Sequence, residues 1–542
     1  MAKVIVDGHE IEIGGHERLN GIQAAQRIGV DVPHYCWHPG LTVVASCRMC
    51  LVETGTLDAQ TGKITMQPKL SPACQTPAKD GTVFVTNSDK VKQAHAQVEE
   101  GLLLRHPVDC PICDKAGECH LQDYHFEHGQ KERRADVRPF SSRRREMGDT
   151  VTLFVDRCVM CTRCVRFTRE IAGTSELMVT NRGSHEEIDV FPGYPLANKL
   201  SGNVVDLCPV GALGDKDFLY QQRVWFMKRH AGVCAGCSTG CSIWVEENQD
   251  HVYRLKPREN PHINQWWMCD EGRYGSHYVH SDQRQTGLRK HDGKAGNEHV
   301  AIDWGVLAKE LHASLSSAGR LSAVLSPYLT VEEAFLLAKY VRQFDPEALL
   351  ALGPVLTVGH DERFKSGFTI RAEKCPNRRG VEAVIRHFTG SGLSFDDFLV
   401  RCESGTIGGA WVTGGYPQPA FDDSVARRFA AVKTLIVQDL WATPLWERAT
   451  FQVPGATFAE KEGSYVNHAD RLQEFKWAVR PPAGAWAEGP LFWRLLGRPG
   501  LYNAAVAREE LAAEIAYFAV ASGEIPAVGV DLKLNQLAGA VT

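Results

Sequence analysis

The stretch RCVMCTRCVRF, residues 157–167, places three cysteines at intervals of three residues. A further cysteine, Cys208, stands directly before a proline in GNVVDLCPVGAL, residues 202–213. Three thiols on one short loop match three corners of a cube, whereas zinc fingers usually arrange their cysteines in pairs. The spacing therefore indicates a metal cluster rather than a single structural ion.

This pattern is typical of bacterial ferredoxins, in which C-x2-C-x2-C is followed by a Cys-Pro pair. In ferredoxins with two clusters, the fourth cysteine of each run serves the other cluster. This chain has one triplet and one distant Cys-Pro, so a single [4Fe-4S] cluster is the simplest expectation. We call its ligands set 3: Cys158, Cys161, Cys164 and Cys208.

The bulk composition predicts a soluble protein of several domains. A chain of 542 residues is too long for one core, and 44% of its residues are hydrophobic and 23% charged. The net charge of -5 gives no reason to expect nucleic acid as a partner. No run approaches the ~20 apolar residues that span a bilayer, and MAKVIVDGHEIEI lacks the apolar core of a signal peptide. We expect a cytoplasmic protein that reaches a membrane only through a partner.

Cysteine is concentrated in the first half, because fifteen of the seventeen cysteines precede residue 270. The number is odd and the expected compartment is reducing, so disulfides are not expected.

The first four cysteines follow a C-x10-C-x2-C-x23-C pattern among short strand-like segments and one helix, expected near residues 20–28. That arrangement is typical of a [2Fe-2S] ferredoxin-like (β-grasp) domain, although the plant-type spacing is shorter. A zinc knuckle is the alternative, but only one C-x2-C pair is present. Set 1 is Cys36, Cys47, Cys50 and Cys74.

The stretch HPVDCPICDKAGEC, residues 106–119, follows a segment expected to be helical from Ser88 onward. Taken alone, one histidine and three cysteines would favour zinc. Their position between two iron–sulfur patterns favours a [4Fe-4S] cluster, and an imidazole in place of a thiolate makes the site one charge less negative. Set 2 is His106, Cys110, Cys113 and Cys119.

The last group combines CAGCSTGC, residues 234–241, with MCDEGRYG, residues 268–275. Its C-x2-C-x3-C-x27-C pattern suits a third [4Fe-4S] cluster, with a zinc ribbon as the alternative. Set 4 is Cys234, Cys237, Cys241 and Cys269. Fifteen cysteines and one histidine thus form four complete sets, with no cysteine left over in this half.

Several clusters in series are most useful for moving electrons, while the protein fixes and tunes each one. The chain contains neither a G-x-G-x-x-G after a strand nor a P-loop, so nicotinamide or flavin chemistry is expected on another subunit. The basic stretch at residues 131–146 is interpreted as a solvated connector, with a strap against a partner subunit as the alternative.

The second half alternates strands and helices from about residue 281, which predicts a parallel sheet. Residues 321–327 and 349–355 bracket a helix expected at 331–344. Cys402 is expected to pack inside and Cys375 to lie on a surface loop, and no catalytic residues are predicted.

Seven stretches together resemble one family, the 75 kDa-type iron–sulfur (G) subunits of bacterial NADH:quinone oxidoreductase, or complex I. They are PHYCWHPGL, SCRMCLVE, HPVDCPICDKAGECHLQD, RCVMCTRCVRF, GNVVDLCPVGAL, CAGCSTGCSI and MCDEGRYG, and they cover most of residues 1–280. The resemblance implies a [2Fe-2S] cluster on set 1 and [4Fe-4S] clusters on the other three sets. It also implies electron relay from an NADH/FMN subunit toward quinone-side iron–sulfur subunits, with a [2Fe-2S] subunit as a further partner. The place implied is the cytoplasmic face of the inner membrane, without membrane insertion.

The second half resembles the molybdopterin oxidoreductase fold through AEKEGSYVNHADRLQ, residues 459–473. Active members have a lysine two residues after the last cluster cysteine, where this chain has Glu271. No cysteine stands in the context expected of a molybdenum ligand. The resemblance therefore implies a degenerate scaffold without molybdopterin.

The domains expected are a [2Fe-2S] ferredoxin-like domain (1–87), a [4Fe-4S] domain with one histidine and three cysteine ligands (88–140) and a [4Fe-4S] ferredoxin-like domain (141–222). A molybdopterin-oxidoreductase-type [4Fe-4S] domain (223–280) and a degenerate α/β domain (281–542) follow. The alternatives are a molybdopterin-dependent formate dehydrogenase, an electron-transfer subunit of an NAD-linked hydrogenase, an iron hydrogenase and a zinc scaffold. Metal analysis separates the last, since four clusters need about fourteen irons per chain.

Overall fold

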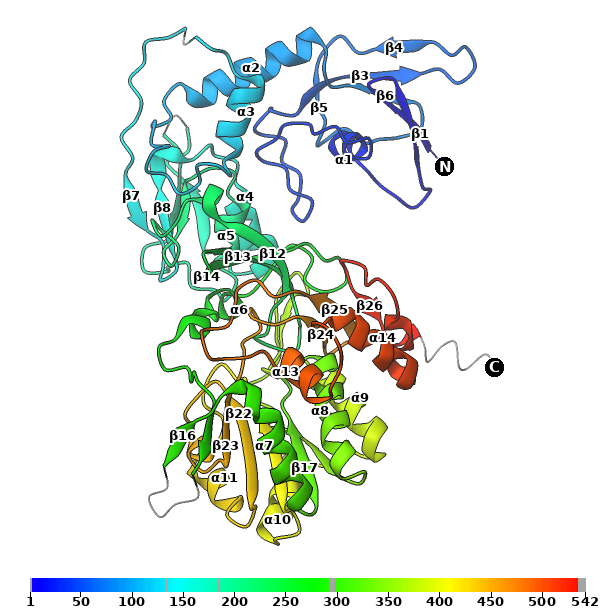
Figure 1. The fold of residues 1–542 in the computed structure, drawn as a ribbon. Helices are drawn as coiled ribbons and strands as arrows, with labels where there is room; N and C mark the ends of the chain where they lie inside the picture. The colour runs from blue at the N-terminus through cyan, green and yellow to red at the C-terminus, as the bar shows by residue number, and fades with distance from the viewer. Residues whose placement is uncertain (1, 133, 184, 293–297, 535–542) are drawn as a thin grey trace. The chain divides into compact units, whose positions relative to one another are not determined.

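The computed structural model describes residues 2–132, 134–183, 185–292 and 298–534 (Figure 1). The chain divides into two compact units. Unit 1 is Met1–Met227 with Phe364–Gly367, and unit 2 is Lys228–Arg363 with Phe368–Thr542. Within the described residues, no helix is long and apolar enough to cross a bilayer. The finer division into five domains stays a prediction.

Unit 1 begins with a mixed sheet that packs on one short helix. The parallel pair β1–β6 lies inside it, and the other pairs are antiparallel. The β1–β2 turn uses Asp7 and Gly8 at φ 48° and 85°, the left-handed backbone of a two-residue hairpin turn. The elements are β1 (Ala2–Val6), β2 (His9–Ile13), α1 (Gly21–Gln26), β3 (Leu51–Leu57), β4 (Ile64–Met66), β5 (Ser71–Pro72) and β6 (Thr82–Val85).

Two helices follow this sheet and enclose the loop of set 2. The helix α2 (Asp89–Leu103) begins after Ser88, whose hydroxyl accepts the backbone N–H of Val91, as the sequence predicts. It ends before His106, which leaves all four ligands of set 2 outside the helix. The helix α3 (His120–His128) begins directly after Cys119.

The rest of unit 1 surrounds set 3 with short strands and helices. The sheet β11-β8-β7 is antiparallel, and β9 and β10 form a separate hairpin. The triplet loop leads from β8 into α4, and α5 ends immediately before Cys208. The elements are β7 (Arg144–Glu146), β8 (Val151–Phe154), α4 (Arg163–Phe167), β9 (Leu177–Thr180), β10 (Glu187–Val190), α5 (Asn203–Leu207) and β11 (Leu213–Asp215).

Unit 2 begins with a three-stranded antiparallel sheet that holds the loop of set 4. The loop joins its first two strands, and Cys269 lies at the start of the helix that follows. The elements are β12 (Lys228–Val233), β13 (Ser242–Asn248), β14 (His251–Pro257) and α6 (Asp270–Tyr274).

The body of unit 2 is a seven-stranded sheet of order β16-β15-β23-β22-β21-β17-β18. Its last five strands are parallel, which confirms the predicted α/β fold. The strands are β15 (Arg289–His291), β16 (His299–Ala301), β17 (Leu321–Leu325), β18 (Leu349–Leu352), β21 (Gly409–Thr413), β22 (Thr434–Asp439) and β23 (Phe451–Pro454). The helices that follow strands in sequence include α8 (Val331–Phe344), α9 (Arg378–Thr389), α10 (Phe395–Glu403) and α11 (Asp423–Arg428).

A continuous apolar core joins this sheet to its helices and to a small sheet of β24 (Gly463–Val466), β25 (Arg471–Phe475) and β26 (Val530–Asp531). The remaining helices of this core are α7 (Trp304–Ser317), α13 (Glu488–Leu495) and α14 (Ala504–Glu514). Gly409 in the glycine-rich stretch 405–417 allows tight packing, since a Cβ on it would lie 2.7 Å from the Leu321 side chain. Cys402 is fully buried, as predicted.

The surface position predicted for Cys375 is wrong, because its side chain is also fully buried. It lies just before α9, where Asn377 donates a hydrogen bond of 2.7 Å to the Leu329 carbonyl and ties the polar-looking segment into the core. Burial raises the pKa of the Cys375 thiol to about 12.

Candidate metal centres

Set 3 is gathered by a loop with an unusual backbone. Its four cysteines line one cavity together with apolar side chains such as Leu153 and Ile188. Met160 and Thr162, which separate the cysteines, have φ values of 46° and 58°. Left-handed residues between ligands turn successive amides inward, and the Met160 N–H donates to the Cys158 sulfur at 3.3 Å.

The thiols of set 3 are enclosed by protein and shielded from solvent. Burial is the main cause that raises the pKa of the Cys161 thiol to about 11, and it also raises those of Cys158 and Cys164. Thiolates in such a place need positive charge close by, which a metal supplies. The donor set therefore fits a cluster with soft sulfur ligands.

Set 4 repeats this local geometry in unit 2. Its four cysteines line one cavity, and the Gly236 N–H donates to the Cys234 sulfur at 3.4 Å. The Cys269 sulfur accepts the Gly272 N–H at 3.3 Å at the start of α6. A Cβ on Gly272 would stand 2.9 Å from the Cys234 sulfur, so the backbone approaches as closely as only glycine allows.

Set 2 lies on the turn between α2 and α3, where all four ligands line one cavity. Burial lowers the pKa of His106 to about 4, with Arg157 as the next cause, so its imidazole is neutral and able to bind a metal at pH 7. A Cβ on Gly211 would stand 2.1 Å from the Cys113 sulfur, so here too only glycine lets the backbone come this close to a ligand. Arg157 is held by Asp109 at 2.9 Å.

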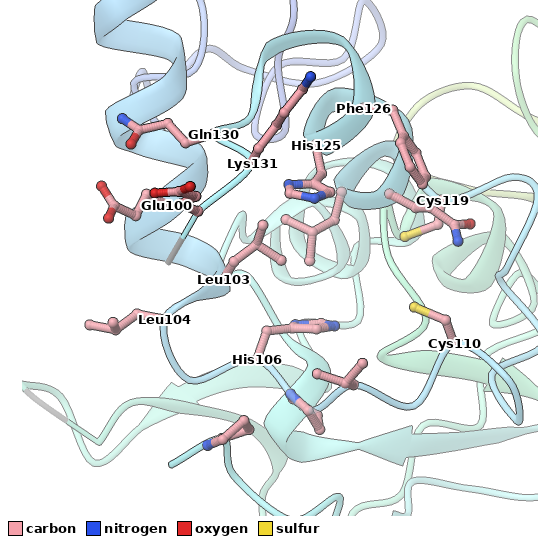
Figure 2. Close-up of a pocket in the computed structure, with 16 residues that line it drawn as sticks. Glu100, Leu103, Leu104, His106, Cys110, Cys119, His125, Phe126, Gln130 and Lys131 are labelled. Carbon is pink, nitrogen blue, oxygen red and sulfur yellow. The ribbon is translucent and has the colours of Figure 1, made fainter. Parts of the chain in front are cut away.

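A larger cavity of about 360 Å³ opens beside set 2 between α2 and α3. Figure 2 shows His106, Cys110 and Cys119 among the side chains that line it, together with Leu103 at the end of α2 and Phe126 of α3. Cys110 is exposed, whereas Cys113 is buried. Set 2 therefore has one side open to solvent and one side enclosed.

Set 1 comes together in the first sheet's domain, with Cys50 directly before β3 and Cys74 shortly after β5. The Cys36 thiol is close enough to those of Cys47 and Cys74 for their hydrogen bonding to lower its pKa, and Cys74 lowers the pKa of Cys50 in the same way. The loop again uses left-handed residues, Ala45 and Arg48, at φ 51° and 60°. Three of the four cysteines are buried, and Cys47 is partly exposed.

Each predicted set of four is thus brought together, and all seventeen cysteines are free thiols. In the described part of the chain, no group of three or more His, Cys, Asp or Glu side chains is arranged to hold one metal ion. The ligands of a cluster stand further apart than those of a single ion, because iron and sulfide lie between them.

The basic stretch at residues 131–146 contacts acidic groups of its own unit, since Arg143 binds Asp156 at 2.9 Å and Arg145 binds Glu187 at 3.1 Å.

Sequence reasoning missed the charged side chains next to these sets. Arg163 and Arg166 stand inside the RCVMCTRCVRF motif, yet nothing in the motif indicates their partners. In unit 2, the Lys374 ammonium lies 2.8 Å from the Glu271 carboxylate beside set 4. A lysine from a segment distant in the sequence thus lies beside Glu271, next to set 4.

Four family models match successive parts of the chain. They describe a 2Fe-2S iron-sulfur cluster binding domain (1–89), an NADH-ubiquinone oxidoreductase-G iron-sulfur binding region (96–134), a ferredoxin-like domain of NADH-quinone oxidoreductase subunit 3 (148–214) and a molybdopterin oxidoreductase Fe4S4 domain (227–281). The chain is a relative of the G subunits of NADH-quinone oxidoreductase. The sequence-based resemblance is confirmed, and 2Fe-2S and 4Fe-4S binding domains are present.

The NADH-quinone oxidoreductase G subunit of Rickettsia felis is 33% identical over 339 residues, which are 62% of this chain and 48% of that protein. The corresponding G subunit of Pseudomonas putida is 35% identical over 56% of this chain and 33% of its own length. The mitochondrial NADH dehydrogenase [ubiquinone] iron-sulfur protein 1 of Solanum tuberosum is 37% identical over 51% of this chain and 36% of that protein. The chain thus spans at most about half the length of these curated relatives.

Among solved structures, a chain of an NAD+-reducing [NiFe]-hydrogenase in the H2-reduced state is 25% identical, with a TM-score of 0.36. The match covers 41% of this chain and 91% of that one.

Proposed function

We propose that this chain is an electron-relay subunit of a respiratory NADH:quinone oxidoreductase. Set 1 would hold a [2Fe-2S] cluster, and sets 2, 3 and 4 would each hold a [4Fe-4S] cluster. Such clusters supply one-electron transfer when bound. The observation that supports the proposal is the gathering of each set of four ligands in a stretch that an iron–sulfur family model matches.

The chain's own residues have three tasks in this function. The left-handed loop residues and the glycines beside sets 2 and 4 bring the ligands together. Apolar side chains such as Leu153 keep water from set 3. Buried cations such as Arg166 set the charge around the ligands.

The partners proposed are an NADH/FMN-binding subunit, a [2Fe-2S] subunit and quinone-side iron–sulfur subunits of a peripheral arm. The place proposed is the cytoplasmic face of the membrane, where the chain is peripheral. The α/β body of unit 2 is proposed to be a scaffold without molybdopterin, because Glu271 replaces the lysine of active molybdopterin enzymes.

Iron and sulfide analysis with electron paramagnetic resonance tests the ligand sets, and about fourteen irons per chain are expected. The change Cys158→Ala in the assembled complex tests the relay. It is expected to abolish NADH-driven quinone reduction while NADH–ferricyanide activity, which needs only the flavin end, is largely kept. Quinone reduction at the normal rate in a variant that lacks the set 3 signal would contradict the relay.

A further inference from the structure

Two arginines of α4 are buried between set 3 and set 1. Arg163 and Arg166 are 5% and 1% exposed. The Arg166 Nη2 donates to the Cys36 carbonyl of set 1 and, at 3.2 Å, to the Cys161 carbonyl of set 3. One nitrogen atom therefore joins the main chain of a ligand in each set, although the two ligands are far apart in the sequence.

Arg163 makes a second bridge beside the first. Its Nη2 donates to the Trp37 carbonyl at 2.5 Å, and its Nη1 donates to the Leu207 carbonyl at 3.2 Å. Trp37 follows a ligand of set 1, and Leu207 precedes a ligand of set 3. Both guanidinium groups thus span the same two sets.

Neither cation has an acidic partner among the described residues. Both guanidinium groups donate to main-chain carbonyls there, and each Nε is buried without a partner. Glu170 is engaged by the Thr42 N–H and hydroxyl at 2.9 and 2.6 Å. By contrast, Arg157, which is similarly buried beside set 2, is paired with Asp109.

The Arg166 guanidinium lies against the main chain of a ligand from each set, Cys36 of set 1 and Cys161 of set 3. An unpaired buried cation is costly, and anionic thiolate-ligated centres on both sides would offset that cost.

We propose that Arg166, assisted by Arg163, is a positioning residue that raises the reduction potentials of the centres at sets 1 and 3 together. The inference rests on the proposed function, since it needs a cluster at each set. Reduction adds one electron, and hence one negative charge, to a centre without forming or breaking a bond in the protein. A cation close to both ligand sets stabilises the reduced form of each.

The test compares Arg166→Gln, which loses the charge but keeps hydrogen-bond donors, with Arg166→Lys, which keeps the charge. Potentiometric titration followed by electron paramagnetic resonance gives the midpoint reduction potential of the cluster at each set in the full-length protein. We expect Arg166→Gln to make reduction of both clusters at least about tenfold less favourable. For a one-electron step this lowers each midpoint reduction potential by about 59 mV. Arg166→Lys should recover more than half of that change.

The signals of sets 2 and 4 in the same samples are internal controls and should not move. The matched control Arg508→Gln removes an arginine that is 2% exposed in unit 2, where it is paired with Glu474 at 2.6 Å, and should leave sets 1 and 3 unchanged. Should Arg166→Gln lose its iron, Arg163→Gln replaces it and must lower both midpoints by a smaller amount.

Full iron content with unchanged midpoints, or a change at only one of the two sets, would overturn the inference. An equal change in Arg166→Lys would do the same, because it would remove charge as the cause. A wild-type protein without iron–sulfur signals would instead contradict the proposed function itself, so the two failures can be told apart.

Discussion

Sets 3 and 4 have nearly the same local geometry and very different electrostatic surroundings. In both, three cysteines lie on one loop, a fourth comes from a distant segment, and an amide two residues after the first cysteine donates to its sulfur. Set 3 adjoins two buried arginines without acidic partners among the described residues, whereas beside set 4 Lys374 is neutralised by Glu271. The ligand pattern therefore specifies what is bound, and distant residues specify how easily it is reduced.

The two units that hold these sets also differ in what stabilises them. Unit 2 has a seven-stranded sheet with a continuous apolar core that involves no ligand of set 4. In unit 1, sets 2 and 3 lie on loops between short helices and strands, and the small core of the first sheet includes Cys50 and Cys74 of set 1. Small domains with little core depend on metal for folding.

The largest expected effect follows from this difference. Anaerobic removal of iron with a chelator should unfold much of unit 1 around sets 2 and 3, because metal binding supplies folding free energy there. The parallel strands β17, β21 and β22 of unit 2 should stay folded. Hydrogen exchange measured by mass spectrometry before and after chelation is the readout. Equal loss of protection in both units would remove the proposed difference.

The local parts of this picture could be predicted from the sequence. Ligand spacing and the Ser88 helix start depend on neighbours along the chain, and the structure places them as expected. The prediction for Cys375 is wrong because its neighbours in AEKCPNRRG are polar, while its burial depends on packing that a local pattern does not contain. The contact between Arg166 and Cys36 crosses two predicted domains, so no spacing rule could reveal it.

An effect of intermediate size concerns the buried carboxyl of Glu99 in unit 1. Burial raises its pKa from 4.5 to about 7, although the Tyr35 hydroxyl donates to it at 2.6 Å. The folded state therefore holds a proton that the unfolded state releases near pH 4.5, so stability falls as the pH rises toward and through 7. Between about pH 6 and pH 8 this group should cost unit 1 about 1 kcal/mol of unfolding free energy.

The change Glu99→Gln should remove that part of the pH dependence, since an amide does not titrate. Urea unfolding of unit 1, followed by hydrogen exchange at about pH 6 and pH 8, measures it. The control Glu127→Gln changes a side chain that is 63% exposed on α3 and should keep the wild-type slope. A Glu99→Gln protein with the wild-type slope would show that another group is responsible.

The smallest expected effect tests the neutralised surroundings of set 4. Lys374→Met leaves Glu271 without its partner and should lower the set 4 midpoint by a few-fold change in the reduction equilibrium, while Glu271→Gln should raise it by a similar amount. The effect should be weaker than that of Arg166 because the Glu271 side chain is 48% exposed and water screens it. The double variant should return close to the wild-type midpoint, since it removes one charge of each sign. Changes of the same sign in the two single variants would mean that packing rather than charge determines the midpoint potential at set 4. The contrast with set 3 would then have no electrostatic basis.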